Sequence, residues 1–331
     1  MGGVTVDLGP LGSVLADASV TEVLLNGPGR AWVERAGRLE PLGVDLDEDG
    51  LRRLVERVIG PLGLRLDRGS PILDARLPDG SRLHAVTAPV ALDGTCVAIR
   101  RFRAVPFPLS AFGADSRLEG LLEWAVSAGW NLLVAGGTGA GKTSLLNTLS
   151  AAVAPGERIV TVEEIAELRL HGGHVVRLEA RPPNAEGSGA VPIRDLVRAA
   201  LRLRPDRLVV GEVRGPEAFD LVQALNTGHD GSFCTIHANG CREALTRLES
   251  LVLLAGTGLP LPAARAQVAA CVDAVVHVAR RPGGQRRIRA VAEVDGDGAG
   301  VRLLHPRGGE DRLRRPARRA DAGPWPEGPA R

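Results

Sequence analysis

Short apolar runs separated by turn residues fill the first third of the 331-residue chain. The stretch EVLLNGPGRAWVERAGRLEPL (22–42) predicts three strands joined at NGPG and AG. The stretch PILDARLPDGSRLHAVTAPVALDGTCVAIRRF (71–102) predicts at least two more strands around PDG and LDG. Between them, residues 47–63 carry apolar side chains at helical spacing, namely Leu51, Leu54, Val55, Val58 and Ile59. The pattern predicts a small N-terminal α+β domain over residues 1–104.

A different pattern occupies residues 115–295, where strand-length apolar runs alternate with helical stretches. The predicted strands are NLLVA, RIVTVEE, RLVVGEV and GSFCTIHA, and the helices among them are KTSLLNTLSAAV, IRDLVRAALRLR and PEAFDLVQALNTG. A long loop is expected between RIVTVEE and IRDLVRAALRLR. Buried strands separated by helices are typical of a parallel sheet covered on both faces, so we predict an α/β domain here.

Proline and glycine mark two segments outside these domains. In RAVPFPLSAFG two prolines flank a phenylalanine, so residues 105–114 are predicted to form an extended interdomain linker. The tail, residues 296–331, is rich in Arg, Pro and Gly without periodicity. We predict that it is disordered and solvated, with contact between its arginines and anionic lipid as the alternative.

Composition matters mainly for what it excludes. Lys142 is the single lysine among 41 Lys plus Arg, which leaves 40 arginines and indicates a bias toward GC-rich codons rather than nucleic-acid binding. The net charge of +2 is too balanced for a polyanion-binding protein, so no nucleic-acid partner is expected. Four scattered cysteines without a CxxC pair predict reduced thiols and no zinc. The absence of a signal-peptide pattern and of an ~18-residue apolar run predicts a cytoplasmic protein.

The stretch GGTGAGKT fits the P-loop pattern G-x-x-x-x-G-K-[ST]. Its residues are Gly136, Gly137, Thr138, Gly139, Ala140, Gly141, Lys142 and Thr143. Glycines let backbone N–H groups approach phosphate oxygens, and the following helix presents its positive N-terminus. We predict that Lys142 binds the β- and γ-phosphates of ATP and that the Thr143 hydroxyl ligates Mg²⁺. Lysine persists here against the arginine bias because the P-loop encloses a compact ammonium rather than a planar guanidinium.

Acidic residues follow two other predicted strands. The apolar run in RLVVGEV ends in Gly211–Glu212, and Gly211 stands where an aspartate is usual. We predict that Glu212 orients the attacking water or holds Mg²⁺ through water, with a purely structural glutamate as the alternative. Glu163 and Glu164 end RIVTVEE, at the strand end where ligands bind in parallel sheets. Glu163 is the catalytic candidate of the two, and capping of the next helix is an alternative that suits Glu164 better.

Two histidines flank the strand in TGHDGSFCTIHAN. His237, at its carboxyl end, is predicted to bind the γ-phosphate or a catalytic water, against the alternative of a core histidine. His229, before the strand, is a second nucleotide-site candidate.

Arginines supply the remaining candidates. Those that could complete a nucleotide pocket are Arg100 and Arg101 before the linker, and Arg177 and Arg181 in the long loop. The helical stripe of Arg194, Arg198 and Arg202 is expected to face solvent or another subunit.

Together these motifs resemble the type II/IV secretion ATPases, and within them the Tad/Flp pilus assembly ATPases. The resemblance covers residues 18–295 and rests on TEVLLNGPG, DARLPDGSRLHA, IRRF, GGTGAGKTSLLN, IVTVEEIAELRL, HVVRLEARPPNAEG, IRDLVRAALRLRPDRLVVGEVRG and ALNTGHDGSFCTIHAN. It implies a RecA-like motor domain after the α+β domain, with Glu163–Glu164 as the acidic box, Glu212 in the Walker B box, and His229 and His237 in the histidine box.

The resemblance also implies how such a protein works. It implies a homohexameric ring with nucleotide between the two domains and arginines completing the pocket. ATP hydrolysis would drive pilin assembly or protein export through inner-membrane platform proteins. Association with the inner face of the cell membrane would be peripheral and only through those partners.

Two departures from the family pattern bear on this interpretation. Glu164 replaces the usual Asp of the acidic box. The four-cysteine zinc module of type II secretion relatives is missing, and this second departure favours the Tad branch. The alternatives are a conjugation-type (type IV secretion) or retraction ATPase, a RecA-like nucleic-acid motor, and a non-hydrolysing nucleotide switch. Five Phe and no Tyr offer few stacking surfaces for single strands, which argues against the nucleic-acid motor.

Overall fold

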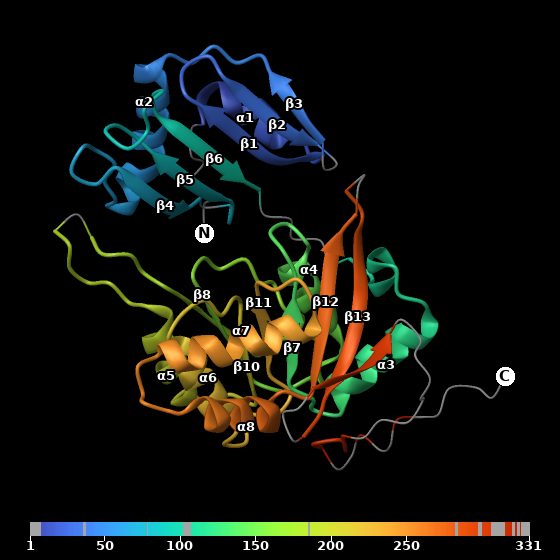
Figure 1. The fold of residues 1–331 in the computed structure, drawn as a ribbon. Coiled ribbons are helices and arrows are strands. Elements are labelled where there is room, and N and C mark those ends of the chain that lie inside the picture. Colours follow the sequence, from blue (N-terminus) through green and yellow to red (C-terminus); the bar gives the residue numbers. More distant parts are fainter. Residues whose placement is uncertain are drawn as a thin grey trace. The chain divides into compact units, whose positions relative to one another are not determined.

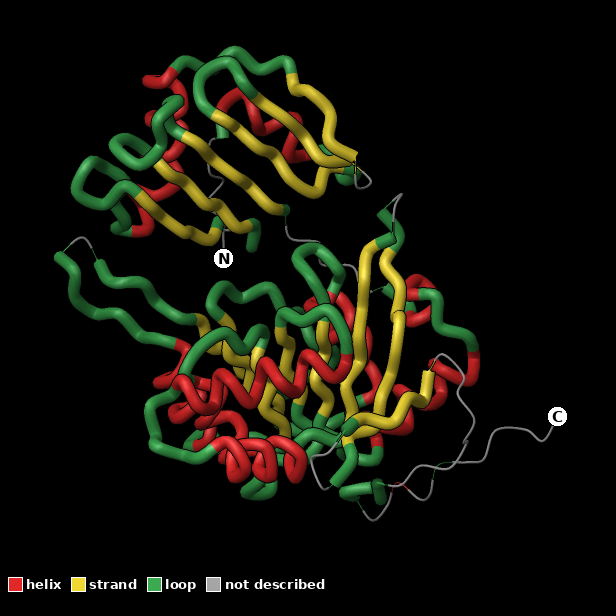
Figure 2. Tube along the Cα trace, viewed as in Figure 1, coloured by secondary structure: helices red, strands yellow, loops and turns green. Residues whose placement is uncertain are grey.

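The computed structural model describes residues 8–35, 38–77, 79–101, 107–184, 186–281, 284–296, 300–305, 315–319, 322 and 325. The chain divides into two compact units by its internal contacts. The first comprises Met1–Ala104 with Pro182–Ala190, and the second Val105–Arg181 with Val191–Arg331. Each unit has its own sheet and its own hydrophobic core (Figures 1 and 2).

The described part of the first unit contains a six-stranded antiparallel sheet in the order β3-β2-β1-β6-β5-β4. The strands are β1 (Val20–Asn26), β2 (Ala31–Arg35), β3 (Arg38–Leu42), β4 (Ile72–Arg76), β5 (Arg82–Val86) and β6 (Cys96–Arg100). The helices are η1 (Gly9–Leu11), α1 (Gly12–Ala16), α2 (Glu48–Ile59) and η2 (Gly60–Leu62).

Helix α2 forms where apolar spacing predicts it. The Asp47 carboxylate accepts a hydrogen bond from the Gly50 N–H at 2.7 Å and caps the first turn. All five predicted apolar residues of the helix are buried, and they join the core of the unit with inward-facing residues of the sheet. The amphipathic pattern is confirmed.

The second unit is built on a mostly parallel sheet in the order β14-β13-β12-β7-β11-β10-β8-β9 (Figure 1). Strands from β12 to β9 in this order are parallel, whereas β13 and β14 add antiparallel. The strands are β7 (Leu132–Ala135), β8 (Ile159–Glu163), β9 (Val175–Glu179), β10 (Arg207–Val210), β11 (Phe233–Ile236), β12 (Ala274–Arg280), β13 (Arg286–Val294) and β14 (Val301–His305). The helices are η3 (Leu109–Phe112), α3 (Ser116–Ser127), α4 (Lys142–Leu149), η4 (Ser150–Ala152), α5 (Ile193–Leu201), α6 (Glu217–Leu225), α7 (Cys241–Leu254) and α8 (Leu261–Cys271).

Successive residues of the central strands enter two different cores. On β7, Leu133 and Ala135 pack with helices α5 to α8, whereas Leu132 and Val134 pack with α3 and α4. The strands therefore read as continuous apolar runs because both faces are covered. The fold is a P-loop RecA-like α/β domain preceded by a small α+β domain, as the sequence predicts.

Two expectations for the connecting segments need correction. The long loop before α5 contains β9, which pairs in parallel with β8 at the sheet edge; its half-buried residues gave only a weak pattern. The described part of the linker, residues 107–114, is not simply extended. It contains η3, whose Leu109 and Phe112 are buried in the second unit's core, while residues 105 and 106 lie outside the described residues.

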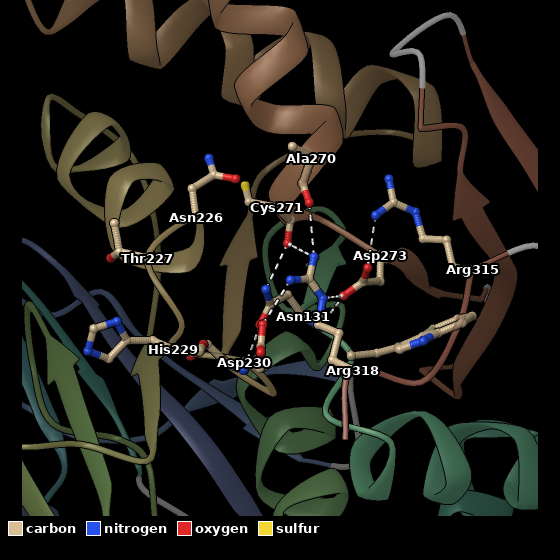
Figure 3. A network of polar contacts seen from close by, with 12 residues as sticks. Asn131, Asn226, Thr227, His229, Asp230, Ala270, Cys271, Asp273, Arg315 and Arg318 are labelled. Atoms are coloured by element: carbon tan, nitrogen blue, oxygen red, sulfur yellow. Dashed lines mark hydrogen bonds and ion pairs between the residues drawn. The ribbon is translucent and has the colours of Figure 1, made fainter. Parts of the chain in front are cut away.

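The prediction of a disordered tail is wrong for two stretches of residues 296–331. Strand β14 pairs antiparallel with β13. Residues 315–319, which we name the C-terminal strap, form ion pairs and hydrogen bonds with the rest of the second unit, and Figure 3 shows those of Arg315 and Arg318. Their partners lie far away in sequence, so local composition could not reveal them. Among the described residues, no helix combines the length and the apolar character needed to span a membrane.

Candidate nucleotide site

The P-loop connects the carboxyl end of β7 to α4, and its backbone geometry requires glycine. A Cβ atom on Gly136 would lie 2.4 Å from the carbonyl oxygen of Val278 on β12, closer than any side chain tolerates. Gly141, the N-cap of α4, has φ +99°, a left-handed conformation that favours glycine. The N-terminus of α4 therefore opens directly onto the loop, as phosphate binding requires.

The Lys142 ammonium lies buried at the centre of this loop, and the side chain is only 8% exposed. Its Nζ atom donates to the carbonyl oxygens of Gly136 at 3.0 Å and Gly137 at 3.2 Å. It also lies 3.2 Å from Nε2 of His237, which follows β11. The structure thus brings together the lysine and histidine predicted from separate motifs. Thr143 follows, half-buried, as the second residue of α4.

His237 links Lys142 to Glu212. Its Nε2 atom accepts from the Lys142 ammonium and also lies 2.9 Å from Oε1 of Glu212, an oxygen that has no hydrogen-bond partner among the described residues. Burial lowers the pKa of His237, and the charges of Lys142 and Arg214 lower it further while Glu212 opposes them. The ring is therefore neutral near pH 7.

Arg214 bridges the acidic residues at the ends of two strands. Its guanidinium donates to Glu212 at 2.9 Å and to Glu164 at 2.8 Å. Burial raises the pKa of Glu212, but the Arg214 hydrogen bond and the charges of Arg214, Lys142 and His237 outweigh burial and hold it below its usual value. Glu217, at the start of α6, accepts from the backbone N–H of Arg214 at 2.7 Å and fixes this loop. Sequence reasoning missed Arg214, although it stands two residues after Glu212.

Glu163 is buried at the end of β8 and only 3% exposed. Its Oε1 atom accepts from the backbone N–H groups of Glu167 at 2.9 Å and Leu168 at 2.8 Å, whereas Oε2 has no hydrogen-bond partner among the described residues. Burial raises the pKa of Glu163 to about 7, although both N–H bonds and Arg177 oppose the shift. A Cβ on Gly211 would lie 2.8 Å from Cγ of Glu163. An aspartate at position 211 would therefore collide with the Glu163 side chain.

The helix-capping alternative for Glu163 and Glu164 is wrong. The described residues between β8 and α5 contain no helix for either carboxylate to cap. Glu163 instead fixes the loop that follows β8, and Glu164 is an exposed partner of Arg214.

The structure places His229 away from this group within the chain. His229 precedes β11, at the sheet edge opposite the P-loop, because the loop follows the carboxyl end of the parallel neighbour β7. Its Nδ1 atom lies 3.0 Å from the carbonyl oxygen of Ala224 on α6. The two histidines share a motif in the sequence but flank opposite ends of one strand. The nucleotide-site prediction for His229 is therefore not supported within one chain.

The arginine candidates occupy different settings. In the second unit, Arg177 lies in β9 and donates to the Ala166 carbonyl at 3.1 Å, and exposed Arg181 forms an isolated backbone bridge with Val191. In the first unit, exposed Arg100 ends β6, and Arg101 donates to the carbonyl oxygens of Asp17 and Val20. Their nucleotide roles stay predictions.

The predicted arginine stripe on α5 is partly engaged within the unit. Arg194 and Arg198 donate to Asp220 of α6 at 2.7 and 2.8 Å, and Arg202 is exposed. Two of the three arginines thus tie neighbouring helices together rather than pointing freely into solvent.

Known proteins share this sequence over most of its length. The family described as "Type II/IV secretion system protein" matches residues 4–313. The chain is 44% identical over 295 residues to a putative conjugal transfer protein of Mycobacterium tuberculosis, covering 86% of this chain and 83% of the relative. It is 36% identical over 314 residues to the type IV secretion system protein PtlH of Bordetella pertussis, covering 84% and 90%. The conjugal transfer protein TrbB of Rhizobium radiobacter is 32% identical over 289 residues, covering 85% and 86%.

Solved structures with the same fold are more distant in sequence. The ATPase DotB of Legionella pneumophila superposes with a TM-score of 0.59 at 20% identity, over 86% of this chain and 79% of that one. The pilus retraction motor PilT with bound ADP superposes with a TM-score of 0.58 at 17% identity, over 89% and 82%. At these identities the likeness establishes the fold alone. The family match over nearly the whole chain and the 44% identity establish more: the chain belongs to the type II/IV secretion system protein family.

Proposed function

We propose that this chain is an ATPase that hydrolyses ATP with Mg²⁺ at the P-loop and powers transport through a conjugation-type, type IV secretion machinery. One observation carries the catalytic part: the side chains of Lys142, His237, Glu212, Arg214 and Glu164 form one connected polar network at the carboxyl ends of parallel strands. Ligands of open α/β sheets bind at this edge. The names of the M. tuberculosis, PtlH and TrbB relatives support the transport part.

The site fits a magnesium nucleoside triphosphate. Gly136 allows the loop to pass within contact of β12, and the N-terminus of α4 presents N–H groups to an anion. The Lys142 ammonium now donates to two loop carbonyls, and phosphate oxygens are stronger acceptors that would draw it outward. Thr143, next on α4, would ligate Mg²⁺, which when bound neutralises charge on the β- and γ-phosphates.

The remaining residues suit the activation of water. Glu212, held as a carboxylate by Arg214, would accept a hydrogen bond from the attacking water and orient it. His237, neutral near pH 7, would be released by Lys142 when that ammonium binds phosphate, and its ring would then be available to the γ-phosphate or that water. Glu163 accepts hydrogen bonds from the loop that carries Glu164, and so helps to hold Glu164 in position beside Arg214.

We further propose that the protein works as a homohexamer on the inner face of the cell membrane, held there by membrane platform proteins. Arg100, Arg101, Arg177 and Arg181 are the candidates to complete a nucleotide pocket. ATP turnover would move the first unit through the linker, and a platform protein would receive that movement.

A second candidate is Tad/Flp pilus assembly, which the motifs around the P-loop and the histidines resemble. Deleting the gene in its host separates the two functions. Loss of conjugal or effector transfer with normal pili supports the first, and loss of pili with normal transfer supports the second. Complementation with the Lys142→Ala variant, which should fail, ties either phenotype to ATP turnover.

The catalytic assignment is tested by substituting Lys142. Lys142→Ala should lower phosphate release at least ~100-fold because the variant loses the cation that stabilises transferring phosphate. Lys142→Arg is the matched control for charge alone, and we expect it to be almost as inactive, since a planar guanidinium does not fit the buried position. Wild-type rates of phosphate release in Lys142→Ala would contradict the assignment.

A further inference from the structure

The P-loop lies at the carboxyl ends of the parallel strands. At the opposite end of the sheet, a polar network binds the C-terminal strap (Figure 3). The N-terminal ends of the parallel strands β7, β11 and β12 form this end of the sheet, which we call the N-terminal edge. The strap lies beyond residue 313, where the match to the secretion family ends. The strap therefore lies outside the matched region, whereas the residues that it contacts lie within it.

Asp273 is the centre of the network and only 2% exposed. Its carboxylate accepts from the Asn131 backbone N–H at 2.8 Å, from Arg318 Nε at 2.6 Å and from Arg315 Nη1 at 2.9 Å. A buried carboxylate is costly unless it is paired and fully hydrogen-bonded. Two of these three hydrogen-bond donors are arginines of the strap, so the Asp273 carboxylate is a binding group for cations.

The end of α8 supplies a second set of acceptors. Arg318 donates to the Ala270 carbonyl at 2.9 Å and, from its other terminal nitrogen, to Asp230 at 2.8 Å. Arg315 donates to the carbonyl oxygen of Ala269. The last carbonyls of a helix lack intrahelical partners and carry partial negative charge. Carboxylates set beside such carbonyls suit a guanidinium, whose five N–H groups can donate in several directions at once.

Backbone contacts hold the strap in register. The N–H groups of Arg318 and Arg319 both donate to the Ala128 carbonyl, at 2.9 and 3.1 Å. The indole of Trp130 donates to the Pro316 carbonyl at 3.0 Å. The side chain of Arg319 pairs with Glu157 at 2.6 Å. Main chain and side chains thus recognise one peptide together, as a binding site would.

We propose that this edge is an arginine-peptide binding site and that the chain's own strap fills it. The contacts above join the strap to residues of the same chain, which supports an intramolecular occupant. The strap ties the end of α8 and the start of β12 to the segment that leads into β7. This inference goes beyond the proposed function and does not depend on ATP hydrolysis.

Hydrogen–deuterium exchange on the full chain tests the site. The amides of Arg318 and Arg319 should exchange slowly in the wild type, and Arg318→Ala should accelerate them at least ~10-fold because the bonds to Asp273, Asp230 and Ala270 are lost. Arg318→Lys should lie between the two, since one ammonium cannot reach all three acceptors. Arg53→Ala, at an exposed arginine of α2, is the matched control and should change nothing at the strap.

Three results would overturn the proposal. One is fast exchange of both strap amides in the wild type. Another is equal exchange in Arg318→Ala and Arg53→Ala while the amides of β7 and β10 stay slow, which shows that the fold is intact. The third is strap protection that falls on dilution, because the occupant would then be the strap of a second copy.

Discussion

The Glu163 carboxyl group has an environment that favours its protonated form. One oxygen accepts two backbone hydrogen bonds, and the other meets no hydrogen-bond partner among the described residues. Burial raises its pKa from 4.5 to about 7. The fold therefore gains a stability contribution that is fully present below the unfolded pKa of 4.5, and it loses this contribution as pH rises through 7.

This residue gives a prediction about pH. Glu163→Gln keeps the acceptor oxygen but cannot ionise, so the unfolding free energy of the variant relative to wild type should rise by about 3 kcal/mol between pH ~5 and pH ~8. Urea unfolding across this range measures it. Exposed Glu164→Gln is the control, and its unfolding free energy should follow the wild-type dependence on pH because Glu163 is unchanged. Parallel pH curves for wild type and Glu163→Gln would rule out the raised pKa.

The role of Arg214 as a link between two acidic residues cannot be predicted from its residue type. In a chain with 40 arginines, its type carries no signal. Only the fold shows that it joins Glu212 to Glu164, which end different strands.

At the scale of elements, the strand ends β8 and β10 must fit against each other. Gly211 directly follows β10, and a side chain there would collide with Glu163 at the end of β8. The glycine at position 211 is visible in the sequence, whereas the clash that a larger residue would meet there follows from the parallel pairing of two strands separated by more than 40 residues.

We expect Gly211→Ala to destabilise the second unit by roughly 1–3 kcal/mol, because the new methyl group must displace the buried Glu163 side chain. The ATPase rate should fall as well, since Glu163 holds the loop that carries Glu164. Thermal unfolding and phosphate release measure the two effects. Gly173→Ala is the control in the same unit, because a Cβ there would meet nothing within 4 Å. Equal stability of the two variants would contradict the steric account.

At the scale of the whole molecule, the proposed homohexamer makes a prediction about arginines that act between subunits. Arg181 is exposed, and the backbone bridge to Val191 holds its position in the chain. If Arg181 completes a neighbour's pocket in a ring, an intact site needs Lys142 from one subunit and Arg181 from another.

Mixing two inactive variants tests this. Arg181→Ala and Lys142→Ala should each lose most phosphate release as pure rings. When they are assembled together in equal amounts, about a quarter of the interfaces regain both groups, so activity should return to about a quarter of wild type. Light scattering on the same samples confirms that rings form. Activity that stays absent in mixed rings would place Arg181 in its own subunit's site, whereas wild-type activity of the pure Arg181→Ala ring would place it outside catalysis. Arg177→Ala, mixed in the same way, compares the second candidate.

The sequence by itself determined the features that depend on local pattern. Apolar periodicity predicted α2 and the central strands, because burial on one or two faces leaves a direct trace in residue order. The P-loop motif predicted Lys142 at a strand-to-helix turn, because its glycines meet a backbone demand within eight residues. Strand-end positions predicted that Glu212 and His237 meet Lys142, because parallel strands share one carboxyl edge.

Tertiary structure alone decided the features that depend on distant partners. Strand β9 and the strap have weak local patterns, and β14 was hidden in a tail of biased composition; pairing and ion contacts with remote segments make them ordered. His229 and His237 share a motif, yet they lie at opposite ends of β11 because one precedes this strand and the other follows it. The physical reason is common to all of these cases. Local sequence encodes burial and backbone conformation, whereas the position of a charge depends on which distant segments the sheet brings beside it.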